Sequence, residues 1–208
     1  MNTGDAVVYV VDDDASVRKA VTRTLKSFGW PVVTFETASE FLDHQRADVP
    51  SCLILDVKMP GVSGIELQEQ LAAHGVDLPI VFMSGHGDIP MSVKAMKAGA
   101  VDFLPKPADE QQLLETVQQA LKRHANQRQE AAALHEFRQR VDSLTKREFQ
   151  VMALVISGML NKQIASQMNI TEYTVKVHRG RVMEKTGVGS FAELVRLCER
   201  SGLSAQDQ

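Results

Sequence analysis

The first 120 residues alternate between short apolar runs and stretches with helical periodicity, and this alternation constrains the fold most strongly. The helical stretch at residues 15–28, for example, places Val17, Val21 and Leu25 on one face. Short apolar runs separated by amphipathic helices are typical of parallel strands that are buried on both faces. We therefore predict a five-stranded, doubly wound parallel sheet, with the short run that opens with Pro31 at its edge and the other four runs buried on both faces. The five runs are residues 6–11, 31–35, 51–55, 79–83 and 101–104.

Charge divides the chain into an acidic and a basic part. Residues 1–122 carry 17 Asp and Glu against 10 Lys and Arg, whereas residues 143–208 carry 6 against 9. At 208 residues, the chain is long enough for two small domains. We expect an α/β domain over residues 1–122, a helical linker over 123–142 and an all-α domain over 143–208. A flexible tether, or a helix break in the polar segment 124–130, stays open as an alternative.

The basic part shows four short helical segments and no strand pattern. Ser143 or Thr145 caps the first segment, Thr171 opens the third and Ser190 opens the fourth. A tight turn at residues 169–171 separates the second segment, 161–168, from the third. This arrangement predicts a compact four-helix domain of the helix-turn-helix type that binds DNA.

Polar side chains follow the predicted strands of the acidic part. Asp12 and Asp13 follow the first strand, Asp56 the third, Ser84 the fourth, and Lys106 comes shortly after the fifth. Because the carboxyl ends of parallel strands meet at one edge of a sheet, we expect these side chains to converge. A solvated turn is the plainer alternative for the acidic triplet at residues 12–14.

The expected pocket suits a divalent cation and a phosphoryl group. Adjacent carboxylates repel one another unless a cation neutralises them, and Mg²⁺ prefers oxygen ligands. We expect Mg²⁺ (or Mn²⁺) to be held by Asp12, Asp13, Asp56 and the backbone carbonyl of Lys58. An ammonium group at Lys106 would support attack by a carboxylate on phosphorus.

Three further residues complete the predicted mechanism. Pro107 permits a cis peptide bond that would aim the preceding lysine into the pocket. Ser84 would donate a hydrogen bond to a phosphoryl oxygen after transfer, and Phe103 would fill the space that the serine leaves. A strand-end hydroxyl and an ordinary core aromatic ring are the alternatives for these two residues.

Together, these motifs resemble the receiver domain of bacterial two-component response regulators, which has a flavodoxin-like fold, over residues 5–122. The resemblance implies that Asp56 accepts a phosphoryl group from a sensor histidine kinase, and that Ser84 and Phe103 switch. It also implies that the domain catalyses only its own phosphoryl transfer and slow hydrolysis, so the chain is no metabolic enzyme. Residues 84–91 resemble the FixJ-type subgroup, in which the helix at 90–98 and the strand at 101–104 form a dimer on phosphorylation.

The basic part resembles the LuxR-type helix-turn-helix of the FixJ and NarL family, through residues 144–148, 161–165 and 170–178. Val175 and Val182, with His178 as a further candidate, are expected to face inward from the helix that starts after Thr171. The resemblance implies base contacts at Lys176, Val177 and position 180, where a glycine offers no base reader. Phosphate contacts are expected from Lys162, Thr174, Arg179 and Arg181. The predicted DNA-binding set is Lys162, Thr171, Tyr173, Thr174, Lys176, Val177, Arg179, Gly180 and Arg181.

These features predict a phosphorylation-controlled transcription factor, an activator that dimerises on double-stranded promoter DNA, with RNA polymerase as a further partner. A resemblance over the whole chain to regulators of aromatic-compound catabolism implies an operon of that kind, such as one for styrene. A phosphoryl shuttle or kinase-interacting protein without a DNA target is the alternative. A phosphatase of the haloacid dehalogenase type is disfavoured because Lys58 stands where it needs a second aspartate.

The sequence also predicts a cytoplasmic protein. It has no run approaching the roughly 20 apolar residues of a membrane span and no leader-like start. Cys52 and Cys198 lack the spacing of a metal or redox pair and are interpreted as small buried side chains of a reducing compartment.

Overall fold

A computed structural model of the chain describes residues 6–85 and 89–203. The chain forms two compact units, Met1–Arg128 and Gln129–Gln208. The division between them lies within the segment 123–142 that was expected to be a linker. None of the helices in the described ranges is long and apolar enough to cross a membrane.

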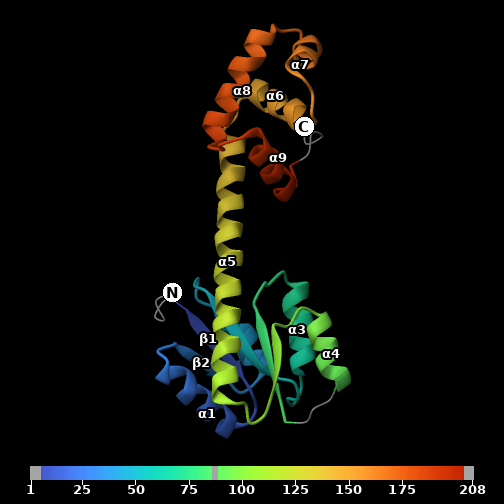
Figure 1. Cartoon of the computed structure of the whole chain (residues 1–208). Coiled ribbons are helices and arrows are strands. Elements are labelled where there is room, and N and C mark those ends of the chain that lie inside the picture. Colours follow the sequence, from blue (N-terminus) through green and yellow to red (C-terminus); the bar gives the residue numbers. More distant parts are fainter. Residues whose placement is uncertain (1–5, 86–88, 204–208) are drawn as a thin grey trace. The chain divides into compact units, whose positions relative to one another are not determined.

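The first unit contains a five-stranded parallel sheet with the order β2-β1-β3-β4-β5 (Figure 1). This confirms the predicted fold and the edge position of β2. The expectation that all other strands are buried on both faces is wrong for β5, because it forms the second edge of the sheet and three of its four residues are not buried. The strands are β1 Val7–Val11, β2 Val32–Phe35, β3 Ser51–Asp56, β4 Ile80–Ser84 and β5 Asp102–Pro105.

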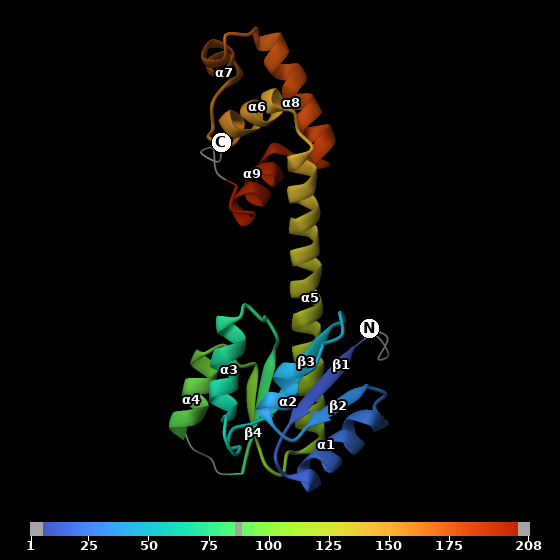
Figure 2. The same cartoon turned by 180° about the vertical axis from the view of Figure 1, so that it is seen from behind.

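Helices cover both faces of the sheet (Figures 1 and 2). Alternate strand residues point to opposite faces. Val8 and Val10 therefore pack with α1 and the start of α5, while Tyr9 and Val11 pack with α2, α3 and α4. Burial of each such side chain stabilises the fold by about 1.5–3 kcal/mol, which fixes the strand ends and hence the positions of the polar residues that follow them. The helices are α1 Ala15–Ser27, α2 Ala38–Asp43, α3 Gly64–Ala73, α4 Ile89–Lys97 and α5 Glu110–Asp142.

Helix α5 contains 33 residues, so residues 123–142 are helical in the structure. Two contacts attach its middle to the first residue of β3 and to the loop before that strand. The backbone N–H of Ser51 donates to Nδ1 of His124 at 2.8 Å, and Arg128 pairs with Asp48 at 2.6 Å. Burial lowers the pKa of His124, which keeps its ring neutral and able to accept this hydrogen bond. The first unit therefore holds α5 as far as Arg128.

The second unit is all-helical, as predicted. Thr145, Thr171 and Ser190 cap α6, α8 and α9 through their side-chain oxygens. Asn169 adopts the left-handed conformation (φ 54°) and ends α7, which makes the tight turn into α8. The apolar faces of α6, α8 and α9 pack with Phe137 and Val141 at the end of α5. The helices are α6 Lys146–Ile156, α7 Asn161–Met168, α8 Glu172–Thr186 and α9 Phe191–Arg200.

An ion pair between buried Glu148 and exposed Lys185 joins α6 to α8. The Glu148 carboxylate lies 2.7 Å from Lys185 Nζ and accepts the Thr145 backbone N–H at 2.9 Å. The hydrogen bond from Lys185 is the largest of the causes that lower the pKa of Glu148 from 4.5 to about 2. Because folding depresses the pKa of Glu148, the ionised carboxylate stabilises the folded state. This stabilisation is complete above pH 4.5 and is lost as the pH falls toward 2.

We therefore expect Glu148→Gln to destabilise the second unit at neutral pH by about 1–3 kcal/mol, because Lys185 loses its charged partner. The difference between wild type and variant should shrink as the pH is lowered from 6 to 3. Urea unfolding followed by circular dichroism measures this, with the exposed Glu184→Gln as the matched control. A wild-type to variant difference that stays constant over this pH range would contradict the assignment.

Candidate functional site

The carboxyl ends of β1 and β3 bring two carboxylates against one ammonium group. Asp12 directly follows β1, and Asp56 is the last residue of β3. Lys106 directly follows β5, and its Nζ atom lies 2.6 Å from Asp12 Oδ2 and 2.9 Å from Asp56 Oδ2. Both aspartates are buried. The structure thus brings together three of the residues that the sequence assigned to one pocket.

Backbone amides hold the other oxygen of each carboxylate. Asp12 Oδ1 accepts the Asp14 N–H at 3.0 Å, and Asp56 Oδ1 accepts the Lys58 N–H at 3.3 Å. Asp14 in turn caps α1 by accepting the Ser16 N–H at 2.7 Å. The helix cap therefore fixes the turn in which Asp12 lies.

Burial and pairing act against each other in the pocket. Burial raises the pKa of Asp12 above its ordinary value, although its hydrogen bond with Lys106 acts in the opposite direction. Burial alone lowers the pKa of Lys106, but its hydrogen bonds with Asp12 and Asp56 outweigh burial and raise this pKa. Lys106 therefore stays a cation between two carboxylates.

The residues present fit a divalent cation. One ligand oxygen from each of Asp12, Asp13 and Asp56 lies within 4.8 Å of the others. Three carboxylates face a single ammonium group, which leaves an excess of negative charge, and carboxylates are the ligands that Mg²⁺ takes. Asp13 is exposed and leaves the site open to solvent. The Lys58 amide contacts Asp56, and its carbonyl stays a predicted ligand.

Ser84 contacts the backbone of Lys106, and Phe103 lies on β5 three residues before that lysine. Ser84 is the last residue of β4 and is buried, and its carbonyl accepts the Lys106 N–H at 2.7 Å. Phe103 is half-buried on β5, with its ring centroid 6.3 Å from that of Phe82. The Lys106–Pro107 peptide bond is cis. The switching roles of Ser84 and Phe103 stay predictions, and residues 86–88 of the FixJ-like segment lie outside the described residues.

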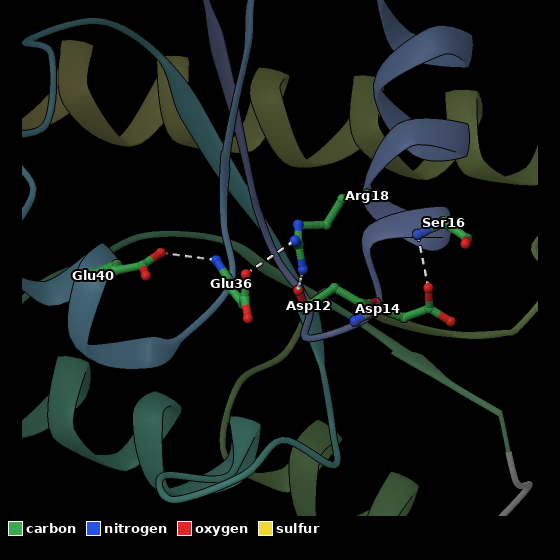
Figure 3. Close-up of polar contacts among 6 residues, drawn as sticks. All are labelled: Asp12, Asp14, Ser16, Arg18, Glu36 and Glu40. Carbon is green, nitrogen blue, oxygen red and sulfur yellow. Dashed lines mark hydrogen bonds and ion pairs between the residues drawn. The ribbon is translucent and has the colours of Figure 1, made fainter.

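Sequence reasoning missed Arg18, which supports the turn behind the pocket. Figure 3 shows its guanidinium donating to the backbone carbonyl of Asp12 and reaching Glu36, at 3.3 Å. The Glu36 N–H in turn donates to Glu40 at 2.9 Å. The partner Glu36, which directly follows β2, lies 18 residues away, so no local pattern in the sequence signals this contact.

Helix α8 presents a polar surface that suits DNA. Tyr173 is 76% exposed, and Lys176, Gly180 and Arg181 are exposed as well. Val177 is half-buried and so less outward than expected.

The opposite face of α8 points inward. Val175 and Val182 are buried, which confirms this prediction, and half-buried His178 has its Nδ1 atom buried. A Cβ atom at Gly180 would meet open space. Lys162 and Thr171 are exposed and Thr174 is half-buried.

Arg179 has two partners inside the second unit. Its guanidinium lies 4.0 Å from the ring centroid of Phe191 on α9 and donates to Asn161 at the start of α7. These contacts tie α8 to both neighbouring helices. A phosphate contact by Arg179 stays a prediction, and the side chain would have to make it from this half-buried position.

Comparisons with known proteins agree over nearly the whole chain. Residues 8–118 match the response regulator receiver domain, and residues 142–198 match the luxR family of bacterial regulatory proteins. The response regulator protein TodT of Pseudomonas putida F1 is 47% identical over 96% of this chain and 88% of its own length. Nodulation protein W of Bradyrhizobium diazoefficiens is 45% identical with the same coverages.

Two solved structures extend this similarity. The structure of the response regulator StyR has 52% identity and a TM-score of 0.79, and the match covers 95% of this chain and 100% of that one. Full-length FixJ from B. japonicum has 41% identity and a TM-score of 0.57, with coverages of 95% and 97%.

Proposed function

Because this chain belongs to the two-component response regulators that join a receiver domain to a LuxR-type DNA-binding domain, we propose that Asp56 is its phosphoacceptor. The chain is a transcriptional regulator and not a metabolic enzyme. Its receiver domain implies a histidine kinase as partner, and its second domain implies DNA binding. Phosphorylation of Asp56 would control dimerisation and promoter binding.

The observation that carries this proposal is the position of Asp56 beside Lys106, at 2.9 Å, in a pocket with two further carboxylates. An oxygen of Asp56 attacks the phosphorus of the kinase's phosphohistidine, the phosphorus–nitrogen bond breaks, and the imidazole leaves. Lys106 offsets the negative charge that develops on the phosphoryl oxygens. Mg²⁺ held by Asp12, Asp13 and Asp56 would supply further charge neutralisation when bound.

The structure supports a route from this site to a dimer surface. Ser84 ends the strand next to β5, and Phe103 lies on β5 itself. On the neighbouring helix α4, the apolar side chains of Val93 and Met96 are 47% and 45% exposed, so a partner could cover both. We propose that Ser84 and Phe103 rearrange on phosphorylation and that α4 and β5 then pair with a second copy. A change from 1:99 to 99:1 needs about 5.5 kcal/mol, and a dimer shares this between two sites.

The remaining partners are proposals of the same kind. A cleft of about 260 Å³ between α1 and the start of α5 includes Lys106 and offers the kinase a surface beside the phosphoacceptor. RNA polymerase is a further proposed partner of the DNA-bound dimer. The sequence identities of 52% to StyR and 47% to TodT support a proposal about the target genes. We propose that the chain activates an operon for the catabolism of an aromatic compound such as styrene.

Titration of labelled promoter DNA with the full chain tests the proposal. Acetyl phosphate and Mg²⁺ should tighten promoter binding by about 5- to 150-fold, the range of ordinary coupling between two sites. Removal of Mg²⁺ by a chelator before the phosphodonor is added should abolish the gain. Promoter binding that ignores phosphorylation, in a protein that is shown to be phosphorylated, would favour the phosphoryl shuttle without a DNA target.

Lys176→Ala is the matched control for the DNA half of this experiment. If Lys176 contacts base edges, the variant should lose affinity for the promoter, by about 1–3 kcal/mol, and much less affinity for random DNA. Phosphorylation of the variant should be unchanged, because Lys176 lies in the other unit. An equal loss on both DNAs would make Lys176 a phosphate contact.

A further inference from the structure

Helix α1 carries four cations and no anion, within a domain whose net charge is negative. Arg18 is already held by the Asp12 carbonyl and by Glu36 (Figure 3). Within residues 6–85 and 89–203, Lys19, Arg23 and Lys26 have no ion-pair or hydrogen-bond partner. These unpaired positive charges repel one another, and an anionic partner bound among them would lower that repulsion.

The same cations line a cleft between α1 and β2. The cleft has a volume of about 410 Å³, and its far side is formed by Val32 and Thr34. The hydroxyl oxygen of Thr22, in the wall of the cleft, is buried and makes no hydrogen bond. The cleft thus combines unpaired positive charge with an unused polar atom.

Strand β2 adds unpaired backbone groups to this cleft. The Pro31 carbonyl accepts the Val8 N–H at 2.9 Å, and the Phe35 carbonyl accepts the Asp12 N–H at 3.3 Å. Because successive residues of a strand direct their backbone groups to opposite sides, Val32 and Thr34 direct theirs away from β1. Since β2 is the last strand at that edge of the sheet, these groups are open for pairing.

We propose that the cleft binds an extended acidic peptide segment of a partner protein, which adds a strand to the free edge of β2. A peptide offers both N–H and C=O groups, so it can pair with both kinds of group on β2. A phosphate or nucleotide would set its anionic oxygens against the carbonyls of Val32 and Thr34. Lys19 and Lys26 are seven residues apart, or about 10 Å along the helix, which spans about three strand residues. Acidic side chains at alternate positions of the segment would face α1.

The test is a fluorescence-anisotropy titration of the full chain with a labelled peptide of alternating glutamate and valine. We expect saturable binding that weakens with salt. The double variant Lys19→Glu, Lys26→Glu should lose about tenfold or more in affinity. The control Lys122→Glu, which reverses an exposed charge on α5, should stay within about twofold of wild type.

A second variant pair tests the strand pairing itself. Thr34→Pro removes an outward N–H without removing a hydrogen bond to β1, so the affinity for the peptide should fall by about fivefold or more. The control Thr34→Val keeps this N–H and should bind the peptide as wild type does. Phosphorylation of each variant by acetyl phosphate at the wild-type rate shows that its receiver domain is folded. Because the lysine variants leave the backbone intact, they decide the matter if Thr34→Pro does not fold.

Three results would overturn the proposal. The first is equal binding of a peptide with lysine in place of glutamate. The second is an unchanged affinity in the double lysine variant. The third is binding of inorganic tripolyphosphate without binding of the peptide, which would make the cleft a simple anion site.

Discussion

Asp56→Asn should abolish phosphorylation by acetyl phosphate, because an amide oxygen lacks the negative charge that attacks phosphorus. The side chain keeps its shape, and Lys106 retains Asp12 as a partner at 2.6 Å, so the fold should persist. Loss of the Asp56 charge also removes an influence that raises the pKa of Asp12. Phosphate-affinity electrophoresis measures the modified fraction, which should fall from most of the protein to none.

The same variant should lose every response that follows phosphorylation. Dimerisation, measured by analytical ultracentrifugation, and promoter affinity should no longer change when acetyl phosphate is added. Asp43→Asn, which removes an exposed carboxylate from the same unit, should respond as wild type. Full phosphorylation of Asp56→Asn would show that another residue is the phosphoacceptor, and unmodified protein that still dimerised fully would separate the dimer from the phosphoryl group.

Gly64→Ala should unfold the first unit far more easily than most single substitutions. A Cβ atom at this position would overlap the backbone carbonyl oxygen of Asp56 and would lie 3.1 Å from the side chain of Leu55. The neighbouring atoms are mainly backbone of the buried strand β3, so they cannot move aside. We expect a loss of about 2–4 kcal/mol in the free energy of unfolding.

Urea unfolding followed by tryptophan fluorescence isolates this effect, because the single tryptophan, Trp30, belongs to the first unit. Gly85→Ala is the matched control. A Cβ atom there meets open space, and the change should stay within about 0.5 kcal/mol. The close approach would be refuted if both alanine variants unfolded at the same urea concentration. Those Gly64→Ala molecules that do fold should also be phosphorylated more slowly, because the turn between Asp56 and residue 64 must shift to fit the Cβ atom.

Local sequence signals predicted most of the fold. Runs of apolar residues gave the strands, and hydroxyl side chains at Thr145, Thr171 and Ser190 marked helix starts, because a cap depends only on residues within one turn. The meeting of Asp12, Asp56 and Lys106 was also predictable, since the carboxyl ends of parallel strands lie at one edge of the sheet.

Features that depend on distant segments were not predictable in this way. The ion pair between Arg18 and Glu36 and the packing of Gly64 on Asp56 join separate elements, and nothing next to them in the sequence signals the contact. The edge position of β5 was missed because an apolar run shows burial of the side chains but does not show how many neighbours the strand has. The partial burial of Val177 depends on the helices packed beside α8.

A single helix contributes to the cores of both units. Leu113, Val117 and Leu121 of α5 are buried in the first unit, and Phe137 and Val141 of the same helix are buried in the second. The core of each unit therefore includes residues of α5 that lie outside the part of the chain matched to its family. A chimera that transplants either half onto another regulator keeps both hydrophobic cores only if its splice point falls between residues 121 and 137 of this helix.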